Sequence, residues 1–189
     1  CFWDLTKQFS SGTPQLLAES NKSLHSSGIF GMDCVMSGNG SALVVTGSKD
    51  KTMCVSEISS GGGVVKTFES DYHSKMVKDV MVSRHNNNLV ASASVDGTIV
   101  VSDVRSRGGK AIVIDNAHNC PDSAVFGLEN IMSEHVLMTA GDDDTIRIFD
   151  LRAFKDPTAK LRGHASANGK HNKIHHPHFT TFGGGGGGG

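Results

Sequence analysis

The heptapeptide Ser92–Thr98 (SASVDGT) occurs in two further versions, Thr46–Thr52 (TGSKDKT) and Thr139–Thr145 (TAGDDDT). The central aspartates of the three heptapeptides are 46 and 47 residues apart. Each heptapeptide is followed by an alternating segment with an acidic residue near its end: Met53–Glu57, Ile99–Asp103 and Ile146–Asp150. A fixed period of this length indicates one supersecondary unit repeated along the chain.

Histidines follow the same period. His25, His73, His118 and His164 each precede a strand-like segment, at separations of 48, 45 and 46 residues. Each repeat then contains two apolar segments, the aspartate turn, the alternating segment and a short fourth strand. The sequence therefore predicts an all-β fold built from four-stranded antiparallel sheets.

The aspartates are expected to fix the turns between strands. In a tight turn, a carboxylate can accept hydrogen bonds from backbone N–H groups one or two residues further on, which sets the register of the hairpin. The residue after the aspartate is predicted to need a left-handed or bridge conformation. Gly97 adopts it freely, Asp144 tolerates it, and Lys51 adopts it at a cost of about 1 kcal/mol.

Together these features resemble the WD-repeat β-propellers. The resemblance rests on Gly163-His164, the three aspartate turns, Trp3-Asp4, Phe149-Asp150 and the spacing between them, and it covers roughly residues 1–180. It implies an incomplete propeller with three full four-stranded blades and a partial blade at each end.

The expected organisation is a propeller fragment over residues 1–182, followed by a disordered poly-glycine tail at 183–189. Typical propellers have 4–8 blades and this sequence opens within a third strand at Cys1, so we expect a fragment that folds well only within a longer parent. The expected units are a partial repeat at 1–20, repeats at about 21–70, 71–116 and 117–162, and a partial repeat at 163–182.

The resemblance also implies a buried hydrogen-bonded chain in each repeat, made of histidine, Ser or Thr, the turn aspartate and a tryptophan. The tryptophan position holds Ser56, Ser102 and Phe149 in the full repeats, and only the partial repeat at the start keeps it, as Trp3. Each full repeat therefore has at most three members of the chain. The residues implied are His25, Thr46 and Asp50; His73, Ser92 and Asp96; and His118, Thr139 and Asp143.

Composition favours an ordinary soluble protein. A net charge of −1 and 20% charged residues argue against nucleic acid as the default partner, and no apolar run approaches the ~20 residues of a membrane span. The cysteines form no C-x-x-C pair, and Cys34 and Cys54 fall in predicted strands, where buried thiols are common. This pattern predicts reduced cysteines and an intracellular location, in the cytoplasm, the nucleus or both.

Histidines near the C-terminus raise a metal hypothesis, because neutral imidazoles bind zinc or copper. On a strand, however, His176 and His178 share a face while His175 points the other way, and no cysteine or carboxylate lies nearby to complete a ligand set. A histidine-rich strand without metal is the preferred interpretation. The histidines concerned are His171, His175, His176 and His178.

Catalysis finds no support, since the sequence has no nucleophile elbow, metalloprotease histidine pair or paired catalytic carboxylates. The run Asp142–Asp144 fits a hairpin turn better than a cation site. We therefore expect a non-catalytic protein-interaction scaffold or adaptor without a cofactor, with partner-contacting residues on the rims of loops.

Two repeats end in Asp-x-Arg, at Asp103–Arg105 and Asp150–Arg152. These ends resemble the DWD box, which implies a substrate receptor docking on the damaged-DNA-binding adaptor of cullin-type ubiquitin ligases. An arginine at this position could engage carboxylates or carbonyls of a partner, or could simply pair with its neighbouring aspartate.

A histone or nucleic-acid reader is the remaining alternative. It would use a group of basic residues towards the C-terminus, although Asp156 interrupts them and a solvated rim explains them better. The group is Arg152, Lys155, Lys160, Arg162, Lys170 and Lys173.

Overall fold

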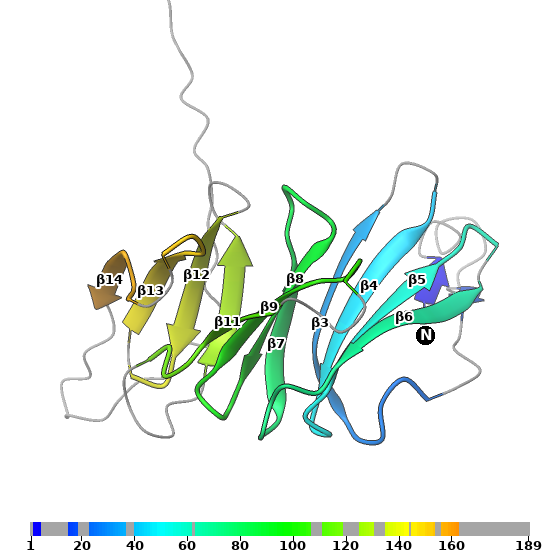
Figure 1. The fold of residues 1–189 in the computed structure, drawn as a ribbon. Coiled ribbons are helices and arrows are strands. Elements are labelled where there is room, and N and C mark those ends of the chain that lie inside the picture. Colours follow the sequence, from blue (N-terminus) through cyan, green and yellow to red (C-terminus); the bar gives the residue numbers. More distant parts are fainter. Residues whose placement is uncertain are drawn as a thin grey trace, which may run out of the picture.

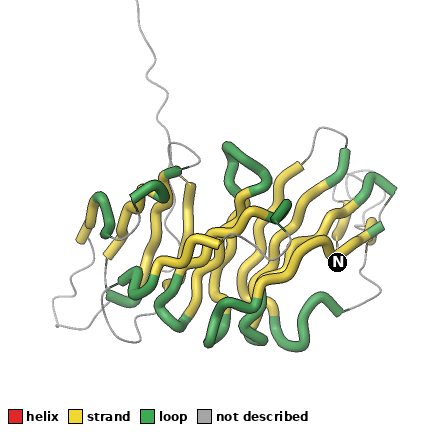
Figure 2. The backbone as a smooth tube through the Cα atoms, viewed as in Figure 1, coloured by secondary structure: helices red, strands yellow, loops and turns green. Residues whose placement is uncertain are grey.

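The computed structural model describes residues 2–4, 15–18, 23–36, 40–61, 63–106, 111–118, 125–130, 135–143, 145–153 and 156–162. Every regular element in these ranges is a β-strand (Figures 1 and 2). None of these ranges contains a helix long and apolar enough to cross a membrane. The all-β prediction is confirmed.

Three four-stranded antiparallel sheets, here called blades 1, 2 and 3, make up most of the described chain. In each blade the strands lie in chain order, and successive strands are neighbours. Blade 1 contains β3 (Ile29–Met36), β4 (Ala42–Ser48), β5 (Met53–Ile58) and β6 (Val64–Ser70). Blade 2 contains β7 (Val77–Val82), β8 (Leu89–Ser94), β9 (Ile99–Asp103) and β10 (Ala111–Ile114). Blade 3 contains β11 (Val125–Asn130), β12 (Val136–Gly141), β13 (Thr145–Asp150) and β14 (Ala159–Arg162).

The expected partial repeat at the start contributes a two-stranded antiparallel sheet of β1 (Phe2–Asp4) and β2 (Gln15–Ala18). The expected partial repeat after Gly163, the histidine-rich segment and the poly-glycine segment lie outside the described residues.

The blades stand side by side, as in part of a propeller (Figure 1). Their first strands are adjacent, since β3 lies against β7 and β7 lies against β11. Strand alternation gives each blade two apolar faces, and facing blades bury them against each other.

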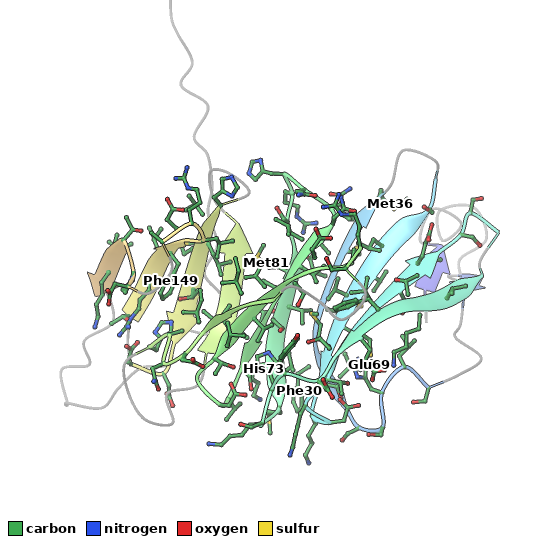
Figure 3. All side chains as sticks on the ribbon, in the orientation of Figure 1. Phe30, Met36, Glu69, His73, Met81 and Phe149 are labelled. Atoms are coloured by element: carbon green, nitrogen blue, oxygen red, sulfur yellow. The ribbon has the colours of Figure 1, made fainter. Side chains whose placement is uncertain are left out.

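Each of the two interfaces between blades has its own apolar core. The core between blades 1 and 2 joins Val45, Met53 and Val55 to Val80 and Val90, all of them at most 3% exposed. The core between blades 2 and 3 joins a second set, of which Met81 and Phe149 are marked in Figure 3: Met81, Ala91, Ile99, Val101, Leu137 and Phe149. Burial of these aliphatic side chains is the main favourable term that holds the blades together.

Two of the residues that follow a turn aspartate are described, and both have the left-handed backbone conformation that the sequence predicts. Lys51 has a φ of 77° and Gly97 a φ of 84°, so both residues after the aspartate are left-handed. Asp144, the third such residue, lies outside the described residues.

The prediction of two buried cysteines is right for Cys54 and wrong for Cys34, which is exposed. From Gly31 onwards the side chains alternate along β3, so Gly31, Asp33 and Val35 face blade 2 and the even-numbered residues point the other way. Cys34 therefore lies beside Met32 and Met36, which are 65% and 67% exposed.

At Gly31 the first strands of blades 1 and 2 approach each other closely. A Cβ atom on Gly31 would lie 2.8 Å from the Cα atom of Asp79, so the two backbones leave no room for a side chain. Gly28, three residues earlier, has nothing within 4 Å of the corresponding position.

We predict that Gly31→Ala destabilises the chain by about 1–3 kcal/mol, because the added methyl group pushes apart two packed backbones. Gly28→Ala is the matched control and is expected to have little effect. Urea unfolding of the two variants measures the difference, and equal midpoints would contradict the close approach of β3 and β7.

Candidate functional site

The two ends of each blade carry different residues. One end holds the turns with Asp50, Asp96 and Asp143, together with the histidine that precedes each blade. The opposite end holds the turns after the third strands, at 103–106 and 150–153, and the loop at 84–88 that joins β7 to β8. We call this second end the arginine rim.

In blade 2 the histidine bridges a hydroxyl group and a carboxylate. His73 Nε2 lies 2.8 Å from Ser92 Oγ, and its Nδ1 lies 3.3 Å from Asp96 Oδ2. The backbone N–H of Ser74 donates to the same carboxylate oxygen at 2.8 Å. The network ties the segment before β7 to the turn between β8 and β9, at the lower end of the blade in Figure 3.

Blades 1 and 3 repeat this arrangement. His25 lies 2.8 Å from Thr46 Oγ1 and 3.2 Å from Asp50 Oδ2. His118 lies 2.9 Å from Thr139 Oγ1 and 2.8 Å from Asp143 Oδ1. The structure therefore brings together all nine residues that the resemblance implied for the full repeats.

A second hydroxyl group in each network was missed from the sequence. Thr52, Thr98 and Thr145 each donate to the turn aspartate, at 2.6, 2.6 and 2.5 Å. The signal was present, because each threonine stands two residues after the aspartate within the repeated heptapeptide. The threonine closes the turn, and its Oγ1 also lies 2.9–3.3 Å from the histidine Nδ1.

Blade 3 contains a further member that sequence reasoning missed. Arg147 is 1% exposed, donates to Asp143 Oδ2 at 2.7 Å, and donates to the carbonyl of Ala117 at 2.9 Å. The corresponding residues of the other blades are Cys54 and Val100. The sequence did contain a signal for this residue, because Arg147 is a charged residue at a position of an alternating strand that is expected to be buried.

The residues at the tryptophan position have different surroundings in the three blades. Phe149 fills it with an apolar ring in the core between blades 2 and 3. Ser56 and Ser102 are at most 2% exposed, and neither hydroxyl has a hydrogen-bond partner among the described residues. The side chain of Trp3 lies outside the described residues.

The networks favour ionised aspartates. Burial alone raises the pKa of Asp50, but hydrogen bonds from the side chain and backbone of Thr52 outweigh it and hold the pKa well below 3.8. Asp96 and Asp143 show the same balance, with their histidines among the groups that lower the pKa. Burial lowers the pKa of His118 below 6.5, and Asp143 opposes that shift only in part.

The two Asp-x-Arg segments form equivalent pairs on the arginine rim. Arg105 donates to both oxygens of Asp103, at 3.0 and 2.6 Å, and Arg152 donates to both oxygens of Asp150, at 2.9 and 2.6 Å. The arginine side chains remain 65% and 67% exposed. Each arginine lowers the pKa of its aspartate, to about 2 for Asp103.

The middle residue of each segment anchors its pair. Val104 packs against the core between blades 1 and 2, and Leu151 packs against the core between blades 2 and 3. Their backbone N–H groups donate to the carbonyls of Asn88 and His135, at 2.9 and 2.7 Å. Each pair is thus held on a fixed turn at the edge of an interface.

A third ion pair on this rim links two blades. Arg84 of blade 2 donates to Asp33 Oδ1 of blade 1 at 2.7 Å and to the carbonyl of Cys34 at 2.8 Å. The backbone N–H of Val82 donates to Asp33 Oδ2 at 2.8 Å. All three arginines on the described part of the rim are therefore paired with an aspartate.

The remaining sequence hypotheses fall partly outside the described residues. Lys155, Lys170 and Lys173 of the basic group and all four C-terminal histidines of the metal hypothesis are not described. Within the described ranges, no three or more His, Cys, Asp or Glu residues are grouped so that they could hold a metal ion.

Residues 62–103 match the family model described as WD domain, G-beta repeat. The chain therefore contains a WD repeat at these residues. The matched segment contains β6 of blade 1 and β7, β8 and β9 of blade 2, so the repeat unit and the blade are offset by one strand. A comparison with curated proteins gave no match. WD-repeat domains act in protein–protein interaction and are generally non-catalytic.

The three histidine–aspartate networks predict that the folded chain loses stability at acidic pH. A folded-state pKa below the unfolded value means that the unfolded chain binds more protons, so stability falls as the pH drops. The free energy of unfolding should decline slightly below pH 6.5, where His118 of the unfolded chain is protonated, and steeply below about pH 4, where Asp50, Asp96 and Asp143 contribute. Urea unfolding between pH 2 and 8 measures this dependence, and Asp96→Asn should reduce its slope below pH 4. A flat profile from pH 6 to 2 would contradict the three networks.

Two buried serines of blade 2 should respond in opposite ways to alanine. Ser102 is 0% exposed and its hydroxyl has no described partner, so Ser102→Ala should stabilise the chain by about 1 kcal/mol. Ser92 is equally buried but bonds to His73, so Ser92→Ala should cost about 1–3 kcal/mol. Thermal unfolding of both variants tests the pair, and destabilisation by Ser102→Ala would contradict an unsatisfied hydroxyl.

Proposed function

We propose that this WD-repeat chain is a protein-interaction scaffold whose partner contacts the arginine rim through the Asp103–Arg105 and Asp150–Arg152 pairs. The observation that carries the proposal is the repetition of one geometry on neighbouring blades. Both arginines are held by two hydrogen bonds to an aspartate, yet about two thirds of each side chain faces solvent.

Fixed arginines suit this role energetically. A guanidinium already held on a rigid turn loses little rotamer freedom when a partner binds, so more of the contact energy appears as affinity. In both pairs, Nη1 makes no hydrogen bond to any described residue. That nitrogen can donate to a carbonyl or carboxylate of the partner without breaking the pair.

The charge balance of the rim favours a protein over a nucleic acid. Each rim arginine is neutralised by an aspartate, through Asp33, Asp103 or Asp150. Nucleic-acid affinity depends mainly on unneutralised cations that contact phosphates. We therefore favour a protein-interaction scaffold over a histone or nucleic-acid reader. We also propose that the protein is located in the cytoplasm, the nucleus or both.

A substrate receptor of a cullin-type ubiquitin ligase is the second candidate. It is supported by the resemblance of both Asp-x-Arg ends to the DWD box and by the shared geometry of the two arginines. In this candidate, Arg105 and Arg152 contact the damaged-DNA-binding adaptor.

We predict that the double variant Arg105→Glu, Arg152→Glu captures at least about tenfold less partner protein than the unmodified chain. Each change places a second carboxylate where an acceptor group of the partner would lie, and the two would repel each other. Crosslinking in cells followed by affinity purification of the full chain measures the loss. Lys49→Glu, Lys51→Glu is the matched control, since it makes the same charge change at the opposite end of blade 1.

Unchanged capture, with an unchanged melting temperature, would reject the arginine rim as the binding surface. Selective loss of the damaged-DNA-binding adaptor would support the ligase receptor. If the adaptor is captured by neither the unmodified chain nor the variant, while the variant loses other proteins, the ligase receptor is rejected and the general scaffold is supported.

A further inference from the structure

An aspartate in the first strand of blade 1 is bonded to blade 2 through both of its carboxylate oxygens. Asp33 Oδ2 accepts a hydrogen bond from the backbone N–H of Val82 at 2.8 Å, and Asp33 Oδ1 accepts one from Arg84 Nη2 at 2.7 Å. Arg84 Nη1 donates back to blade 1, to the carbonyl of Cys34 at 2.8 Å. We call these three contacts the rim clasp. Because two of them join a guanidinium group to blade 1, the clasp fixes the start of the loop between β7 and β8 relative to β3.

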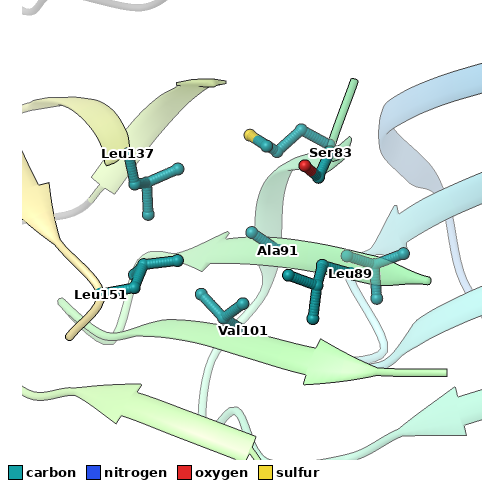
Figure 4. Close-up of a pocket in the computed structure, with 8 residues that line it drawn as sticks. Ser83, Leu89, Ala91, Val101, Leu137 and Leu151 are labelled. Carbon is teal, nitrogen blue, oxygen red and sulfur yellow. The ribbon is translucent and has the colours of Figure 1, made fainter. Parts of the chain in front are cut away.

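The loop between β7 and β8 joins the rim clasp to the turn that holds Arg105. Its two ends are Ser83 and Leu89, which line a small hollow between blades 2 and 3 (Figure 4). The backbone N–H of Ser83 donates to the carbonyl of Leu89 at 2.9 Å and closes the loop. The carbonyl of Asn88, the last loop residue, accepts a hydrogen bond from the N–H of Val104 at 2.9 Å. A continuous series of bonded neighbours therefore runs from the rim clasp to the residue before Arg105.

Apolar packing links the same two places. Val35, two residues after Asp33 on the same face of β3, packs against the core between blades 1 and 2. Val104 packs against that core from blade 2. Packed interiors transmit small displacements, so a shift of this end of β3 would move the surface that supports the turn of Arg105.

The corresponding position of blade 2 holds a residue that cannot form such a clasp. Asp33 is paired with Val45, and Met81 is paired with Ala91, in each case the residue before the network hydroxyl of the second strand. Met81 has no carboxylate and packs in the core between blades 2 and 3. Arg152 therefore serves as an internal comparison, because it has the same pair geometry as its counterpart on blade 2 but no aspartate at this position.

We propose that Asp33 of blade 1 is a positioning residue for Arg105, so that the contact of the arginine rim with its partner depends on all three blades. The inference rests on the proposed scaffold function. Only 18% of the Asp33 side chain is exposed, against 65% for Arg105, so Asp33 acts through the arginine and not by contact. An arginine already held in its bound position loses less freedom when the partner binds, and a loosened loop removes that advantage.

The first test observes the arginine side chains without a partner, by nitrogen NMR of the full 189-residue chain. Nε of Arg105 and Nε of Arg152 each donate to their aspartates, at 3.0 and 2.9 Å, which slows the exchange of these protons with water. Asp33→Asn replaces one acceptor oxygen by an amide nitrogen, so either Val82 or Arg84 loses its acceptor. We expect exchange at Arg105 to rise at least about threefold and exchange at Arg152 to stay unchanged.

Two further variants make this test specific. Arg84→Lys keeps the charge but loses the two-pronged contact with Asp33 and Cys34, so it should raise exchange at Arg105 in the same way. Ser92→Ala is the matched control, because it weakens blade 2 at the histidine end, opposite the arginine rim. It should leave exchange at Arg105 unchanged.

The second test uses the captured proteins that Arg105→Glu, Arg152→Glu loses. Asp33→Asn should reduce their capture at least about threefold, and Ser92→Ala should not. In a chain that already carries Arg105→Ala, Asp33→Asn should have no further effect, because a positioning residue cannot act through an absent side chain.

Unchanged exchange at Arg105 in both clasp variants would overturn the proposal, as would equal changes at Arg105 and Arg152. A further loss of capture on adding Asp33→Asn to Arg105→Ala would also overturn it, because Asp33 would then act independently of Arg105. If exchange responds as expected but Arg105→Glu, Arg152→Glu loses no captured protein, the positioning of Arg105 is supported and the scaffold function of the arginine rim is rejected.

Discussion

A histidine held between a hydroxyl group and a carboxylate fixes the form of each blade. Both ring nitrogens of His73 are engaged inside the fold, so the segment before β7 cannot shift without breaking two polar contacts in a site where water cannot replace them. That constraint sets the position of the first strand relative to the turn between the second and third strands. The register of the sheet follows, and with it the face that each blade presents to its neighbour.

The sequence predicted the parts of the molecule that depend on local chemistry. The spacing of the aspartates and histidines was enough to predict four-stranded sheets, because a turn aspartate acts on backbone atoms within two residues of itself. Thr98 was overlooked although it lies in the repeated heptapeptide, since a threonine at the start of a strand is also common for β-propensity alone.

Other features depend on contacts between blades and could not be predicted from one repeat at a time. The exposure of Cys34 follows from which face of β3 meets blade 2. The burial of Arg147 follows from its contacts with Asp143 and Ala117, which lie in different segments.

The sequence left two interpretations of Asp-x-Arg open, contact with a partner or pairing with the neighbouring aspartate, and the structure shows the pairing. Arg152 does pair with its neighbouring aspartate, as the purely structural reading required. The pair nevertheless projects from the rim on a turn that Leu151 anchors. Pairing with the aspartate therefore leaves the arginine exposed to solvent, so it does not conflict with the proposed contact to a partner.

The one-strand offset between repeat and blade has a consequence for how such a chain changes its length. The matched segment runs from the outermost strand of blade 1 through the third strand of blade 2, so blade 2 takes its fourth strand, β10, from beyond the match. Excision of one period, cut at any pair of corresponding residues, rejoins the remaining strands into whole sheets. Duplication or loss of a genetic unit can thus add or remove a blade wherever the break falls, without leaving a sheet short of a strand.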